Sequence, residues 1–332
     1  MKSIVKQTKK FLNNKSLILG LFFLVIIILI VINPAKYAQV SLNGVLVWAK
    51  ILLPSLLPFF ILTKLFSSTG VINDITKYFS KPTKKLYNCP SESAYVFLMS
   101  VLTGYPVGSK LVSDLHKEGK LTTAQTIRTT SFSSNSGPMF ILGSVAIGMF
   151  ADKKMGFVML FSHILGALIN GLVYRNYKIK EEKLTEKSIQ NSPANYKIDF
   201  SESVLSSVNS ILLIGGVICF TFVLLEALTT NPLFTYFLKL ISKCGLDSNF
   251  INAFICGIGE ITKGCLMLSS LPLTKIAAYT ICTFIITFGG ISTFLQARAF
   301  LKEVVPAKIF LLQKFTHALI SSIICFLLCL II

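Results

Sequence analysis

Four interruptions of otherwise apolar segments hold the residues that could bind a polar ligand. Each concentrates glycine, proline or small polar side chains, whose bare backbone and hydroxyl groups suit hydrogen bonding to a solute. At the broken ends of helices, unpaired N–H groups and the helix dipole also attract anionic groups. The candidate substrate-binding residues are Gly104, Tyr105, Pro106, Gly108, Ser109 and Lys110 in the first interruption, Ser133, Asn135, Ser136 and Gly137 in the second, Glu260, Thr262 and Lys263 in the third, and Gly289, Gly290 and Ser292 in the fourth.

Lys110 and Lys263 are the cationic candidates, and they lie 153 positions apart. Two lysines that face one cavity would suit a ligand with two negative charges. Two alternatives stay open. Lys110 could extend to the membrane surface on its long apolar stem, and Lys263 and Glu260 could simply neutralise each other. An ionisable residue inside a membrane is nevertheless a functional candidate by default.

No pattern in the sequence supports catalysis. It contains no H-E-x-x-H, nucleophile elbow or P-loop, and the interruptions hold no paired carboxylates. The eight cysteines form no C-x-x-C pair, so a zinc site is not expected. His163 and His317 lie in continuous apolar segments, where buried packing is the expected role. The chain is therefore predicted to be no enzyme and to use no metal or cofactor.

The composition indicates a membrane protein. Hydrophobic residues make up 53% of the 332 positions and charged residues only 14%, against about 25% charged in a typical soluble domain. The net charge of +18 could attract nucleic acid, but such a protein carries its charge on an extensive polar surface. That surface is lacking here, so the charge is assigned to loops beside a membrane and nucleic acid is excluded as a partner.

The chain after its first apolar run reads as a duplication. Gly104 and Gly257 lie 153 positions apart, Gly137 and Gly290 also 153, His163 and His317 154, and Ser55 and Ser210 155, with broken and unbroken segments in the same order. Internal repeats of this kind are typical of secondary transporters. The predicted parts are a basic segment with a first transmembrane helix (1–36), a first repeat (38–176), a charged cytoplasmic linker (177–198) and a second repeat (199–332).

The positions of the basic residues favour inverted repeats. If the first broken segment of each half is a re-entrant hairpin and the second crosses the membrane, each half crosses an odd number of times. The lysine-rich N-terminus, the 77–85 loop and the 177–198 linker then all lie in the cytoplasm, as the positive-inside rule requires. The predicted fold is an all-α polytopic membrane protein with two inverted repeats, re-entrant hairpins and broken helices.

Two of the interruptions resemble a known family. The sequences Gly104-Tyr105-Pro106-Val107-Gly108-Ser109-Lys110-Leu111 and Ser131-Phe132-Ser133-Ser134-Asn135-Ser136-Gly137-Pro138 are similar to signatures of the YlbJ-type sporulation integral membrane proteins. These belong to the nucleoside recognition, or Gate, domain group. Residues 54–60 and 213–216 also look like segments of that family.

The resemblance implies a role in endospore formation in a Gram-positive bacterium, in the mother-cell-derived outer forespore membrane. Family members are linked to movement of dipicolinic acid, a small aromatic dicarboxylate, from the mother cell toward the forespore. The order of segments also resembles concentrative nucleoside transporters. Their acidic and amide-bearing hairpin signature is not reproduced around Gly104–Lys110, which argues against a nucleoside as the substrate.

These inferences lead to one leading function and two alternatives. The leading one is a transporter or facilitator for a small organic anion, dipicolinate above all. The alternatives are a nucleoside or nucleobase permease and a non-transporting scaffold of a sporulation complex. The expected partners are the lipid bilayer and a small anionic substrate. Other sporulation membrane proteins and a homo-oligomer stay open, as do the coupling ion and the direction of transport.

Overall fold

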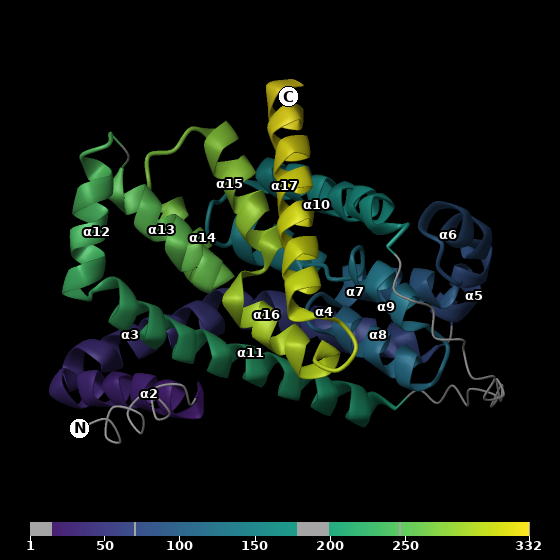
Figure 1. Cartoon of the computed structure of the whole chain (residues 1–332), viewed down its shortest axis with the longest axis horizontal. Helices are drawn as coiled ribbons and strands as arrows, with labels where there is room; N and C mark the ends of the chain where they lie inside the picture. Colours follow the sequence, from purple (N-terminus) through teal and green to yellow (C-terminus); the bar gives the residue numbers. More distant parts are fainter. Residues whose placement is uncertain (1–14, 70, 178–198, 246, 332) are drawn as a thin grey trace, which may run out of the picture.

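The computed structural model describes residues 15–69, 71–177, 199–245 and 247–331, and every regular element in these ranges is a helix (Figure 1). The elements of the first half are α2 (Lys15–Ile32), α3 (Pro34–Val47), the π-helix η1 (Trp48–Leu52), α4 (Leu53–Ser68), α5 (Val71–Tyr78), α6 (Ser80–Tyr87), α7 (Glu92–Thr103), α8 (Val107–Lys117), α9 (Thr123–Thr130), the π-helix η2 (Phe140–Ile147) and α10 (Lys153–Tyr174). Those of the second half are α11 (Phe200–Thr229), α12 (Pro232–Ser242), α13 (Ser248–Gly259), α14 (Ile261–Ser269), α15 (Lys275–Phe288), α16 (Gly290–Leu301) and α17 (Ala307–Ile331).

Five helical segments are long and apolar enough to cross a membrane: Pro34–Phe66, Lys153–Tyr174, Phe200–Thr229, Lys275–Leu301 and Ala307–Ile331. The expectation of an all-helical membrane protein is thus confirmed. The N-terminal apolar run forms α2, which is shorter than these five. The predicted 177–198 linker lies outside the described residues except for Tyr177.

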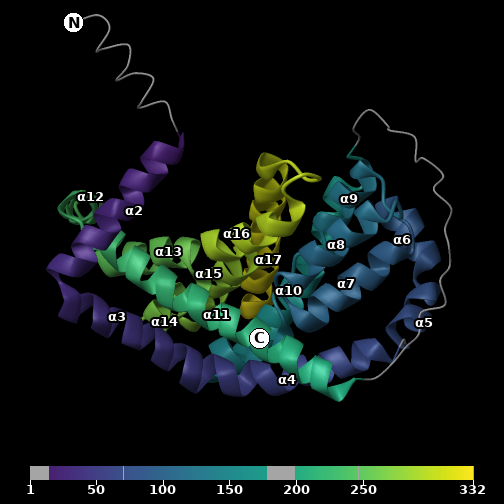
Figure 2. The same ribbon diagram turned by 90° about the horizontal axis from the view of Figure 1, so that it is seen from below.

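One long helical segment, α3 through α4, packs against α11 (Figure 2). The indole N–H of Trp48 donates to the carbonyl of Ile211 at 2.9 Å, and a side chain at Gly44 would lie 3.3 Å from the Cα of Cys219. Nearer the other end, Lys36 pairs with Glu226 at 3.3 Å. Residue numbers rise along one helix as they fall along the other, so the two segments run antiparallel.

Helices α10 and α17 cross at the centre of the molecule (Figure 1). The rings of His163 and His317 stack with centroids 4.9 Å apart, and both side chains are buried as expected. Gly166 packs against Ser321, while the Nδ2 of Asn170 donates to the carbonyl of Gln313 at 3.1 Å. From the Gly166–Ser321 contact to the Asn170–Gln313 contact, residue numbers rise along α10 and fall along α17, so the two helices are antiparallel.

The two ends of α10 contact different parts of the chain. Asp152 caps its N-terminus and accepts hydrogen bonds from the hydroxyl of Tyr279 at 2.6 Å and from Lys275 at 3.2 Å. The Tyr279 hydrogen bond helps to lower the pKa of the Asp152 carboxyl to about 2. Just beyond the C-terminal end, the guanidinium of Arg128 donates to the carbonyl of Tyr177 at 2.9 Å. Helix α15 therefore starts at one end of α10, and α9 lies at the other.

Candidate functional site

The four predicted interruptions are breaks between helices in the structure. Helix α7 ends at Thr103 and is followed by Gly104, whose φ of +77° favours glycine. A side chain there would lie 2.7 Å from the backbone nitrogen of Gly137, so the first two breaks touch. A side chain at Gly290 would lie 3.3 Å from the carbonyl oxygen of Gly257, so the last two also touch. The two contacts match each other, because Gly257 and Gly290 lie 153 positions after Gly104 and Gly137.

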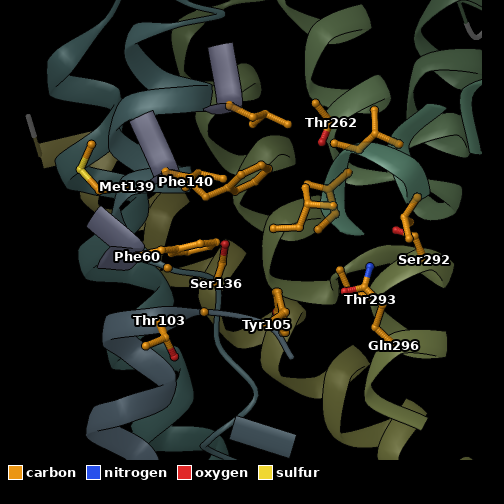
Figure 3. A pocket seen from close by; sticks show the side chains of 18 of the residues that line it. Phe60, Thr103, Tyr105, Ser136, Met139, Phe140, Thr262, Ser292, Thr293 and Gln296 are labelled. Carbon is orange, nitrogen blue, oxygen red and sulfur yellow. The ribbon is translucent and has the colours of Figure 1, made fainter. Parts of the chain in front are cut away.

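A cavity lies where these breaks meet (Figure 3). Its empty space, including the part open to the outside, is about 690 Å³. Seven of the predicted site residues line it: Gly104, Tyr105, Ser136, Gly137, Glu260, Thr262 and Ser292. Each of the four breaks, or the helix that directly follows it, thus contributes to one cavity.

Aromatic side chains form much of the cavity wall. Figure 3 shows the rings of Phe60 and Phe140 on one side, and Ser292 and Thr293 on the other. Phe60 belongs to α4 and Phe140 begins η2. An apolar aromatic wall facing hydroxyl groups suits a planar ring that carries polar substituents.

Glu260 is buried, with 4% of its surface exposed, and it caps helix α14. Its carboxylate accepts a hydrogen bond from the backbone N–H of Lys263 at 2.7 Å. The positive end of the α14 dipole is therefore already matched by a negative charge of the chain itself. The expectation that each broken helix end is free to bind an anion does not hold at this third break.

The two predicted lysines do not face one cavity. The ammonium group of Lys263 lies 3.5 Å from the carboxylate of Glu226 and 3.4 Å from the carbonyl of Phe222. It lines a different pocket from Lys110, and neither side chain lines the central cavity. Thr262 does line it, but Lys263 follows by one residue, about 100° around the helix axis. The ion pair of Lys263 is with Glu226, not with Glu260.

Other predicted residues hold the breaks together and do not line the central cavity. The hydroxyl of Ser133 donates to the carbonyl of Thr129 at 2.7 Å, and the Nδ2 of Asn135 donates to the hydroxyl of Ser100 at 2.8 Å. Gly108 packs against the Ser133 carbonyl. The remaining ones outside the central cavity are Pro106, Ser109, Gly289 and Gly290, of which Pro106 lines the neighbouring pocket with Lys110.

His163 joins two of the breaks. The backbone N–H of Ser136 donates to its Nε2 at 3.0 Å, so Nε2 carries no proton and the proton is on Nδ1. Nδ1 then donates to the hydroxyl of Thr287 at 2.8 Å. The ring thereby fixes the second break, at the cavity wall, to the end of α15.

Lys314 is a residue of this site that the sequence analysis missed. Its ammonium group donates to the hydroxyl of Tyr105 and, at 2.9 Å, to the carbonyl of Ser134. It also lies 4.5 Å from the centre of the Tyr105 ring. Only 4% of Lys314 is exposed, and none of the ion pairs among the described residues includes it. Its position inside the last apolar run was the signal that could have found it.

Residues 49–153 match the model of a family described as nucleoside recognition, named Gate. The matched range begins within η1 and includes the first two breaks. The chain is also 28% identical over 312 residues to the Sporulation integral membrane protein YlbJ of Bacillus subtilis (strain 168). The alignment covers 87% of this chain and 76% of that protein. The expected resemblance to the YlbJ-type proteins is confirmed.

This similarity and the five apolar helices identify a multi-pass integral membrane protein. The similarity to the YlbJ-type protein extends over most of the chain, while the Gate match is confined to the first half. No solved protein structure matches the chain significantly.

Proposed function

We propose that this protein is a secondary transporter or facilitator that moves a small aromatic organic anion, dipicolinate above all, across a membrane of the sporulating cell. The observation that carries the proposal is the buried Lys314, directly behind the Tyr105 wall of the central cavity. A buried cation without a carboxylate partner is costly. An anion in the cavity would offset that cost. The opposite charge of Glu260 is already matched by the N-terminus of α14.

The shape of the cavity supports an aromatic substrate. Phe60 and Phe140 offer flat apolar faces to a ring, and Ser292, Thr293 and Gln296 offer hydrogen bonds to its substituents. The name of the YlbJ-type relative supports a sporulation context. In this proposal the protein lies in the mother-cell-derived outer forespore membrane and moves its substrate toward the forespore.

Inverted repeats supply the symmetry that such a transporter needs, and two contacts support them. Helices α10 and α17 are equivalent by the 154-position offset, run antiparallel and meet at their equivalent histidines. Such a contact is the one expected of two equivalent antiparallel helices beside a pseudo-two-fold axis. The segments α3–α4 and α11 cross in the same way. In addition, the equivalent helices α9 and α15 contact opposite ends of α10.

Membrane orientation gives the first prediction. In the inverted arrangement helix α6, which carries Lys81, is cytoplasmic and the region of Lys239 and Cys244 is outside. Cys244 is an exposed natural cysteine, so a membrane-impermeant maleimide added to intact cells should label it. In a Cys244→Ser background, Lys81→Cys should react only after permeabilisation. Labelling of both positions from the same side would contradict the topology.

Transport itself is the second prediction. Purified protein in liposomes should take up radiolabelled dipicolinate, and an excess of unlabelled dipicolinate should abolish the signal. Protein-free liposomes and the Tyr105→Ala, Phe60→Ala variant serve as controls, since the variant removes one wall of the cavity. Uptake measured with and without ion gradients identifies the driving force. Absence of dipicolinate uptake by protein that is folded and inserted would refute the proposal.

A nucleoside or nucleobase permease is the second candidate, and two observations favour it. The Gate model is described as nucleoside recognition, and the Glu260 carboxylate in the cavity wall could accept hydrogen bonds from ribose hydroxyls or base N–H groups. Uptake of labelled uridine into the same liposomes distinguishes this permease from a dipicolinate transporter. Uridine uptake without dipicolinate uptake would favour the permease, and uptake of neither would favour a scaffold.

A further inference from the structure

A second pocket lies beside the central cavity, between helices α4, α8, α11 and α16. We call it the vestibule. Its characteristic lining residues are Lys64, Lys110, Ser206, Ser207 and Ser210. It shares Phe60, Thr103, Tyr105, Ile214 and Gln296 with the central cavity. The two spaces therefore adjoin, with Tyr105 and Gln296 in the wall of both.

The vestibule carries two positive charges. Lys64 comes from α4 and Lys110 from α8, and their ammonium groups are close enough to repel each other. Glu202 attracts Lys64 electrostatically, but in the described part of the chain neither lysine forms an ion pair or a hydrogen bond. Two cations held in one concave, partly apolar space concentrate the field that attracts an anion.

We propose that the vestibule is a recruitment site for a dianion, in which Lys64 and Lys110 each hold one carboxylate before the solute passes into the central cavity. This inference rests on the proposed transport of a dicarboxylate and adds its capture site. The expectation that two lysines bind one dianion is retained, with Lys64 in the place first given to Lys263. Ser206, at the same wall, offers a hydroxyl group in addition.

The equivalent lysine of the second repeat differs from Lys110. Lys263 is bound to Glu226 at 3.5 Å and lies 5.5 Å from the centre of the Phe222 ring. Glu226 also holds Lys36 at 3.3 Å. The cation on that side is thus neutralised, while Lys110 has no ion-pair partner among the residues that the structure describes. Anion capture is therefore one-sided. Helix α8 continues toward Lys117 and Lys120, which the inverted topology places in the cytoplasm, so capture occurs from the cytoplasm.

The test measures initial dipicolinate uptake into liposomes as a function of concentration. Lys64→Gln and Lys110→Gln should each raise KM about tenfold, since each removes one charge-assisted contact, while the maximal rate stays unchanged. Lys64→Arg and Lys110→Arg should retain most of the affinity. Picolinate, which has a single carboxylate, should lose affinity with the first substitution and little more with the second. Lys81→Gln, an exposed lysine on α6, is the matched control.

The outcomes separate this inference from the proposed function. If the wild-type protein transports dipicolinate and both glutamine variants keep its KM, the vestibule site is wrong and the transporter proposal stands. If the wild-type protein transports no dipicolinate, calorimetric titration of purified protein with dipicolinate still decides: lysine-dependent binding supports the site, and binding that both variants retain, or no binding, overturns it.

A lipid phosphate group is also an anion that the two lysines could bind. Varying the lipid composition of the liposomes distinguishes it from the free solute. Uptake is measured in liposomes of phosphatidylcholine alone and in liposomes that also contain phosphatidylglycerol. Equal KM values in both support a site for the free solute. A KM that rises with phosphatidylglycerol in the wild-type protein, and not in the double Lys64→Gln, Lys110→Gln variant, would assign the vestibule to lipid instead.

Discussion

Replacing Gly108 by alanine should prevent the first two breaks from packing together and so remove transport. A Cβ atom at this position would lie 1.9 Å from the carbonyl oxygen of Ser133 and 2.8 Å from the Cβ of Ser100. The first of these is backbone, which cannot rotate away. Overpacking of a tight site costs about 1–3 kcal/mol, and occasionally more when backbone must move. We expect about 3 kcal/mol of lost stability, measured as a lower melting temperature in detergent.

The matched control for this change is Gly216→Ala in α11. An added Cβ there meets no atom within 4 Å, and alanine is favoured over glycine inside a helix by about 0.5–1 kcal/mol. Its melting temperature should therefore be equal to the wild-type value or slightly higher, and its transport should be normal. If both variants lose stability equally, the close packing of Gly108 on Ser133 does not hold in the folded protein.

The breaks were predictable from the sequence because their composition is exceptional in a membrane helix. Gly104 and Gly137 stand out among apolar neighbours, and both reach the cavity wall. The aromatic wall was not predictable. Both lipid and protein interior favour phenylalanine, and the chain contains 27 of them. Nothing in the local pattern shows that Phe60 and Phe140 face inward while Phe66 is exposed.

The sequence also could not predict which way a charged side chain points or which partner it reaches. Lys110 and Lys263 occupy equivalent positions, but the ion pair of Lys263 depends on Glu226, which arrives from a distant helix. Nothing in the sequence around Glu226 indicates this role. That Lys64 and Lys110 line the same pocket likewise depends on how α4 and α8 are placed. The spacing along the chain therefore predicted where the candidate charged residues lie, but it could not predict which of them form ion pairs.

Lys314→Met should strongly reduce transport and leave the protein at least as stable as before. Apart from the histidines, Glu260 and Lys314 are the acidic or basic side chains that are buried among the described residues, and Glu260 has the helix cap as its partner. Methionine has similar length without charge, so it removes a large desolvation cost. It also removes the positive field that the anion would meet behind Tyr105. We expect uptake of dipicolinate to fall about 100-fold, the equivalent of about 2.7 kcal/mol.

The control is Lys308→Met, the same change at an exposed position near the start of α17, which should alter neither uptake nor melting temperature. The changes in dipicolinate uptake and in melting temperature together show what Lys314 does. If it only supports the fold through its hydrogen bonds to Tyr105 and Ser134, methionine lowers the melting temperature and uptake together. If it supplies the charge that attracts the substrate, uptake falls while the melting temperature holds or rises. Unchanged uptake in Lys314→Met would contradict the anion assignment itself, because the charge on which it rests would be dispensable.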